Sequence, residues 1–182
     1  MDLLPEVQRL CADFDHREIT QAEFLDRCTR LVASTIGCSR AGIWVFHGER
    51  LALRLQCLTM YDAVRDRMTQ VPDEEGPPVA DYFLALEQTG HVMATDARAH
   101  FATAGFFERF LEKKHVRSLL AAAFSVNGRL YGAFTCTQVG SEKEWSRPEL
   151  ALLRVIGSRV SLALANAERA ATDTHPAFFR SL

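Results

Sequence analysis

Cysteine is missing from the middle of the chain: none occurs between Cys57 and Cys136, and none of the five cysteines forms a CxxC pair. Five scattered cysteines, an odd number, are typical of reduced thiols in a cytoplasmic protein and argue against a framework of disulfides. The six histidines include no pair with the i, i+4 spacing of metal ligands on a helix. The sequence therefore predicts no disulfide and no metal site.

Other absences narrow the function further. No run of about eighteen apolar residues is present to span a membrane, and the first residues lack the basic segment and apolar run of a signal peptide. Lysine plus arginine number 21 and aspartate plus glutamate 23, a net charge of −2, so there is no broad positive field. Glycine-rich phosphate motifs are missing. We expect a cytoplasmic protein that binds neither nucleic acid nor membranes and is not an enzyme.

The composition is that of an ordinary globular protein. Of the 182 residues, 48% are apolar and 24% are charged, and a chain of this length buries about 70% of its surface on folding. We divide the chain into an N-terminal helix (1–19), a single domain (20–171) and a C-terminal tail (172–182).

Two helix starts are marked by capping boxes, in which a hydroxyl at the N-cap is followed three residues later by a carboxylate. Thr20–Glu23 begins a helix that Gly37 ends, since glycine adopts a left-handed conformation at low cost. Ser146–Glu149 begins the last helix, which should run to about Ala171. Trp145 and Leu150 flank this second box as a hydrophobic staple.

Two β-hairpins are predicted between these helices. Residues 41–62 form the first: Ile43 to Phe46 are branched or aromatic, Gly48-Glu49 provides a turn, and apolar residues alternate from Leu51 to Cys57. In the second, Asn127-Gly128 joins two apolar runs as a type I′ turn would. A helix over 79–88, a strand over 91–94 and a Phe-rich helix within 95–114 lie between the hairpins. Because hairpins pair antiparallel, the order predicts an α+β domain with helices around an antiparallel sheet.

In this order and spacing the chain resembles a bacterial GAF domain, a small-molecule sensory module that is often attached to kinases and cyclases. The resemblance covers about 20–169 and rests on these segments: Met60-Tyr61-Asp62, Asp81–Glu87, Ala94–Arg98, Val116–Leu120, Asn127–Gly132, Val139-Gly140 and Trp145-Ser146. It implies a GAF-like (profilin/PAS-like) sheet of about six antiparallel strands. The terminal helices would pack on one face, and a lid from about Pro78 to Arg117 would close a pocket on the other.

Several polar and aromatic residues are candidates for lining that pocket. Trp44 is as well explained by packing in the sheet, Asp96 by capping a helix, and the phenylalanines by plugging the space beneath the lid. The candidate ligand-binding residues are Trp44, Tyr61, Asp96, His100, Phe106, Phe107, Phe110, Ser118 and Cys136. The ligand itself is not readable from the sequence, so the cofactor is unknown.

Two chemical specialisations of similar domains need a cysteine in the lid. Free methionine sulfoxide reduction needs a nucleophilic and a resolving cysteine there, and covalent attachment of a bilin needs a cysteine beside a histidine such as His100 or His115. This lid has no cysteine. We therefore expect ligand binding without catalysis, with a reductase-like enzyme as the weakest alternative.

The last helix also predicts a homodimer. Six of its small or apolar residues follow the 3, 4 spacing of a coiled-coil seam: Leu150, Leu153, Gly157, Val160, Leu164 and Ala167. The alternative is that the N-terminal helix of the same chain covers this face. We expect a sensory module that dimerises through its terminal helices and signals to a kinase or cyclase partner, or alternatively a ligand-free dimerisation scaffold.

Overall fold

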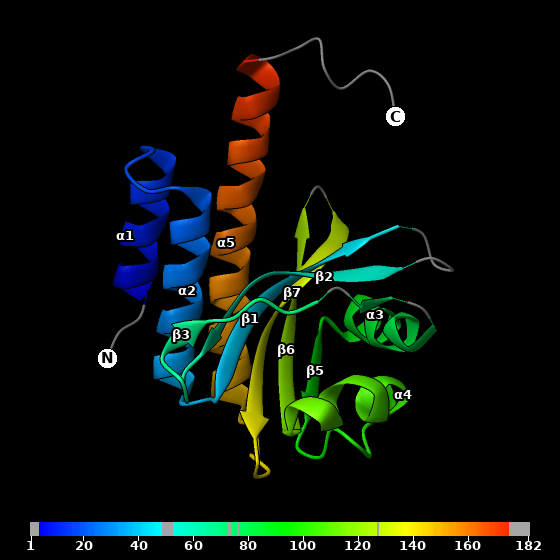
Figure 1. Cartoon of the computed structure of the whole chain (residues 1–182). Coiled ribbons are helices and arrows are strands. Elements are labelled where there is room, and N and C mark those ends of the chain that lie inside the picture. The colour runs from blue at the N-terminus through cyan, green and yellow to red at the C-terminus, as the bar shows by residue number, and fades with distance from the viewer. Residues whose placement is uncertain (1–3, 49–52, 73, 76, 127, 175–182) are drawn as a thin grey trace.

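Figure 1 shows the computed structural model of the chain, which describes residues 4–48, 53–72, 74–75, 77–126 and 128–174. The elements in chain order are α1 (Leu4–Asp15), α2 (Gln21–Ile36), β1 (Arg40–His47), β2 (Arg54–Asp62), β3 (Arg67–Met68), β4 (Glu74–Glu75), α3 (Pro77–Thr89), β5 (His91–Ala94), α4 (Phe101–Phe106), the π-helical turn η1 (Phe107–Leu111), the 3₁₀ turn η2 (Glu112–Lys114), β6 (Val116–Val126), β7 (Arg129–Val139) and α5 (Arg147–Thr174).

The described strands form one antiparallel sheet in the order β3-β2-β1-β7-β6-β5, with β4 paired to β2 off this path. Both predicted hairpins are confirmed by the pairing of β1 with β2 and of β6 with β7. Glu49 and Asn127 in their turns lie outside the described residues. The sequence analysis predicted neither β3 nor β4, because strands of two residues show no periodicity.

Both capping boxes are present. The Thr20 hydroxyl accepts from the backbone N–H of Glu23 at 3.2 Å, while the Glu23 carboxylate accepts from the backbone N–H of Thr20 at 2.8 Å. Ser146 and Glu149 exchange the equivalent bonds at 3.3 and 2.7 Å. These bonds satisfy backbone donors that the first turn of a helix leaves free, so they fix where α2 and α5 begin.

Side chains alternate between the two faces of the sheet and bury a separate apolar cluster on each. Ile43, Phe134 and Leu120 point from β1, β7 and β6 to the face that α1, α2 and α5 cover. Leu119 and Ala133 point to the opposite face, which α3, α4 and η1 cover. The expected architecture is confirmed: terminal helices lie on one face and a lid on the other (Figure 1).

The coiled-coil seam predicted for α5 is corrected by its burial. Leu150, Leu153, Val160 and Leu164 lie in the chain's own core beside α1, α2 and the sheet, and the side chain of Ala167 lies outside the described part. The same chain therefore covers this face of α5, as the alternative interpretation expected. The prediction failed because the stripe that packs a helix onto a sheet has nearly the same spacing as a dimer seam.

Other large side chains of α5 do face solvent. Val155 is 40% exposed and Leu162 is 56% exposed, and they lie seven residues apart on one side of the helix.

In the described part of the chain, no helix combines the length and the apolar character that crossing a bilayer requires.

Candidate functional site

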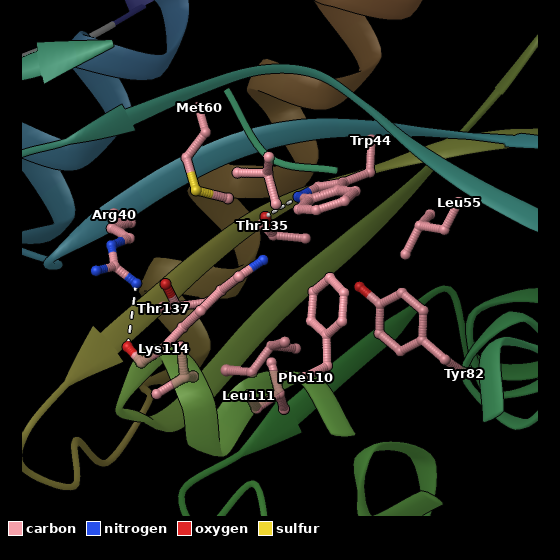
Figure 2. A pocket seen from close by; sticks show the side chains of 13 residues that line it. Arg40, Trp44, Leu55, Met60, Tyr82, Phe110, Leu111, Lys114, Thr135 and Thr137 are labelled. Carbon is pink, nitrogen blue, oxygen red and sulfur yellow. Dashed lines mark hydrogen bonds between the residues drawn. The ribbon is translucent and has the colours of Figure 1, made fainter. Parts of the chain in front are cut away.

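A cavity of about 60 Å³ lies between the sheet and the lid (Figure 2). Strands β1, β6 and β7 supply its floor, β2 one side, and α3, η1 and η2 its cover. The described lining residues are Arg40, Trp44, Leu55, Met60, Val71, Tyr82, Phe110, Leu111, Lys114, Val116, Leu119, Thr135 and Thr137. They include two cations and no carboxylate, and most are apolar.

The floor is built by the alternation of β1 and β7. Arg40, Gly42 and Trp44 share the lid face of β1, and Thr135 and Thr137 share that face of β7. The indole Nε1 of Trp44 donates to Thr135 Oγ1 at 3.1 Å, and the Thr135 hydroxyl donates to the Gly42 carbonyl at 3.3 Å. A Cβ on Gly42 would lie 3.2 Å from that Nε1, so the absence of a side chain leaves the indole its room.

The cover carries aromatic rings and one amine. Phe110 and Leu111 come from the π-helical turn, and Lys114 comes from the last residue of η2. The Lys114 Nζ lies 3.9 Å from the centroid of the Phe110 ring, and Figure 2 shows its side chain reaching towards Trp44 and Thr135. Burial raises the pKa of the Tyr82 phenol well above its usual value, so this hydroxyl is neutral.

An ion-pair network holds one end of the cavity. Arg40 Nε donates to Asp62 Oδ2 at 3.0 Å, and Arg40 Nη1 donates to the Lys114 carbonyl at 3.2 Å (Figure 2). Asp62, only 1% exposed, also pairs with Arg65. Burial alone would raise the pKa of the Asp62 carboxyl, but hydrogen bonds from Arg40 and Arg65 outweigh it and lower that pKa. Asp62 is therefore a carboxylate that fixes the guanidinium of Arg40.

One polar atom of the lining has no bond within the described structure. The Thr137 hydroxyl oxygen is buried, in a residue that is only 7% exposed, and no hydrogen-bond partner for it is present among the described residues. A buried hydroxyl without a partner costs about 1–3 kcal/mol. The group is therefore a place where a bound molecule would gain a hydrogen bond.

Two of the nine candidate residues from the sequence, Trp44 and Phe110, line this cavity. Tyr61 lies outside it: its hydroxyl donates to Asp66 at 2.7 Å, and the Arg30 guanidinium stacks 4.4 Å from its ring centroid. Phe107 is buried in the apolar cluster of the lid. The side chain of Phe106 lies outside the described part of the structure.

Three polar candidates hold the lid's loops together and do not line the cavity. The Asp96 carboxylate accepts from the backbone N–H of Arg98 at 2.8 Å. His100 caps α4 by accepting from the N–H of Ala102 at 3.2 Å, and its burial lowers its pKa. The Ser118 hydroxyl donates to a backbone carbonyl and accepts from the N–H of Lys143 at 2.7 Å. The alternative that Asp96 caps a helix is corrected: its carboxylate bonds lie in the turn at 96–99, and the N-cap of α4 is His100.

Cys136 points to the opposite face of the sheet, into the core with the terminal helices. Burial and a hydrogen bond with Cys38 raise the pKa of its thiol well above the usual value, so it is a small core residue and a poor nucleophile. No group of three or more potential metal ligands occurs among the described residues. Whether any of the nine candidates touches a ligand stays a prediction.

The sequence analysis missed Arg40, Lys114, Thr135 and Thr137. The positions of the two threonines could have been predicted from the sequence. The Asn127-Gly128 hairpin fixes the register of β7, and Thr135 and Thr137 alternate with Phe134 and Cys136, so the two threonines share the opposite face of the strand. Arg40 and Lys114 carried none, since surface cations are common and only the fold brings these two to one cavity.

Comparison with known proteins places this geometry in a family. No curated protein sequence matches the chain. Solved structures do match it, at identities that show the fold alone. A phycoerythrobilin-bound GAF domain from a cyanobacterial phytochrome is 15% identical with a TM-score of 0.73, over 93% of this chain and 97% of that one.

Two further solved structures have the same fold as this chain. JSC1_58120g3 in its far-red absorbing dark state, with bound biliverdin IXα, is 19% identical with a TM-score of 0.72, over 89% of this chain and 98% of that one. The blue-light absorbing PixJ GAF domain of Thermosynechococcus elongatus is 14% identical with a TM-score of 0.69, over 100% and 98%. The family model of the GAF domain matches residues 21–164. This chain belongs to the GAF domain family.

Proposed function

We propose that this chain is a sensory domain that binds a small molecule in the cavity beneath its lid and reports occupancy through its terminal helices. The observation that carries the proposal is the lining itself: apolar walls with a few converging polar groups are what a small-molecule site needs. The domain acts by binding, without catalysis. Five free cysteines support a reducing, cytoplasmic compartment.

The cavity has a short route to the terminal helices. Trp44 lies on its floor, while the neighbouring residues Ile43 and Val45 of the same strand pack in the core that holds α2 and α5. A ligand that shifts β1 therefore acts on both faces of the sheet. The output passes to a partner protein, for which a kinase or a cyclase is the class that the resemblance implies.

The ligand we propose is smaller than the bilins named for the similar structures. Pockets for drug-sized ligands measure about 300–1,000 Å³, against about 60 Å³ here. The sequence also has no cysteine between Cys57 and Cys136 for a thioether. A compact molecule, held without a covalent bond, fits both observations.

The second candidate function is a dimerisation module that needs no ligand. The small volume of the cavity and the burial of Tyr82 and Leu111 above it favour this candidate. In either case we propose a homodimer, now through the exposed side of α5 that carries Val155 and Leu162, with the twofold symmetry usual for dimers.

A ligand screen with a blocked cavity tests the sensory proposal. Val116→Phe adds a ring at the cavity wall, and Arg117→Phe adds the same ring at the neighbouring exposed position. Each protein is melted with a panel of small metabolites. A ligand at a hundred times its Kd adds about 2.7 kcal/mol of stability, so Tm rises by about 5–10 °C.

The proposal expects at least one compound that raises the Tm of the wild type and of Arg117→Phe and leaves that of Val116→Phe unchanged. Compounds that act equally on all three proteins bind elsewhere. A panel with no cavity-dependent compound favours the dimerisation module.

A further inference from the structure

We infer that the molecule bound in this cavity is a small monocarboxylate with an apolar body. The inference rests on the proposed function, since it names the ligand class of the same site. It follows from three features of the lining: a buried hydroxyl that lacks a partner, two cationic side chains at the same end, and apolar walls around the remaining space.

The polar end lies where β1, β7 and η2 meet. The Thr137 hydroxyl has no partner among the described residues. Arg40 has five N–H donors, of which the described bonds to Asp62 and to the Lys114 carbonyl use two. Figure 2 shows Arg40, Thr137 and Lys114 grouped on the same side of the cavity. A carboxylate accepts hydrogen bonds only, and the Thr137 hydroxyl and the Arg40 guanidinium can donate to it beside the positive charge of Lys114.

The rest of the space suits a short apolar chain or ring. Trp44, Leu119 and Phe110 are among its walls, and the indole N–H of Trp44 is already used by Thr135. A water molecule needs about 10–15 Å³ of such space, so 60 Å³ takes the volume of about four to six waters. A short-chain carboxylate such as butyrate is of that size.

The balance of charge favours one negative charge on the ligand. Asp62 already neutralises Arg40 from behind, so the two cations of the lining do not call for a dianion. Phosphate is more strongly hydrated, and apolar walls would not repay the loss of its water shell. A neutral ligand of the same shape would leave the donors of Arg40 and Lys114 with a weaker acceptor.

Isothermal titration calorimetry with paired probes tests this inference. Butyrate and butyramide have the same shape and differ in charge, and inorganic phosphate serves as an anion without an apolar body. We expect butyrate to bind at least tenfold more tightly than butyramide, because hydrogen bonds to a charged group are about twice as strong as neutral ones. We expect no heat of binding from phosphate.

Two variants assign the polar end. Thr137→Val keeps the shape and removes the hydroxyl, and we expect it to weaken butyrate about tenfold with Tm unchanged or raised. Lys114→Met keeps the apolar stem over Phe110 and should remove most of the preference for butyrate over butyramide. Val116→Phe, which blocks the cavity, is the control for the site, and neither butyrate nor butyramide should give a heat of binding with it.

The inference is overturned if butyramide binds as tightly as butyrate, if Lys114→Met leaves the preference intact, or if no carboxylate binds. These outcomes are separable from failure of the proposed function. A cavity-dependent neutral compound in the melting screen would leave the sensory role standing while removing the carboxylate, whereas a screen without any such compound would remove both.

Discussion

Trp44 and Thr135 join the two central strands from beneath the lid: the indole nitrogen donates to the threonine hydroxyl across 3.1 Å, and both atoms are buried. The partners lie 91 residues apart in sequence. The bond fixes the orientation of the largest ring on the cavity floor, and with it the shape of the space above.

Replacing Thr135 by valine should therefore destabilise the fold. The variant leaves the Trp44 N–H buried without an acceptor, which costs about 1–3 kcal/mol. Thr137→Val is the matched control, since it stands two residues along the same face and its hydroxyl has no described partner. Urea denaturation followed by circular dichroism measures both. Equal losses of stability would contradict the assigned bond.

Gly132 should tolerate no side chain. A Cβ there would collide with the backbone carbonyl oxygen of Trp44 and lie 2.7 Å from Cζ of Phe124. Because a backbone atom of a central strand cannot move aside cheaply, Gly132→Ala should cost about 3 kcal/mol or more, at the upper end for overpacking.

Gly157→Ala is the control for that substitution. A Cβ at this helical position meets Phe124 at 3.9 Å, an ordinary contact, and alanine is favoured over glycine in a helix by about 1 kcal/mol. Its free energy of unfolding should rise by roughly that amount. A Gly132→Ala protein as stable as the wild type would show that β1 and β7 are further apart than described.

Asp62 should make stability depend on pH in the acid range. Its folded-state pKa lies below the usual value of 3.8, so its contribution is present above about pH 4 and is lost as pH falls through the folded pKa. Asp62→Asn breaks a buried pair and should cost about 3 kcal/mol at pH 7.

The difference in unfolding free energy between wild type and Asp62→Asn should shrink as pH falls from 5 to 2. Asp81→Asn, an exposed position on α3, is the control and should follow the wild-type curve. If the difference in unfolding free energy between the two proteins stays constant over this range, the ionised Asp62 carboxylate does not form the proposed ion pairs with Arg40 and Arg65.

The dimer proposal makes a prediction about the outer side of α5. Val155 and Leu162 are exposed in the isolated chain, so Val155→Glu/Leu162→Glu should yield a folded monomer, with a Tm lowered only by the loss of the partner subunit. Light scattering after size-exclusion chromatography at micromolar concentration measures the mass. A wild-type protein that is already monomeric there would contradict the dimer.

Local signals in the sequence predicted much of the fold. The boxes at Thr20–Glu23 and Ser146–Glu149 act within one helical turn, and Asn127-Gly128 acts within one hairpin, so each could be recognised without knowing the rest of the chain. The GAF resemblance then supplied the faces on which the helices pack.

The site could be predicted only in part, because it is made of distant residues. Arg40 meets Lys114 across 74 positions of sequence. The π-helical turn at 107–111 also changes the helical phase, so that Phe107 enters the lid's core while Phe110 reaches the cavity. A regular 3.6-residue period could not separate these two rings. The α5 seam failed for another reason, since its spacing serves a core face as well as a dimer.

Native mass spectrometry of the purified chain is the most direct test of whether the cavity holds a ligand. The wild type should carry a small-molecule mass that is released on denaturation, or acquire one when butyrate is added, and Val116→Phe should carry neither. A wild-type chain whose mass equals that of the polypeptide alone under both conditions would contradict a carboxylate-binding sensor.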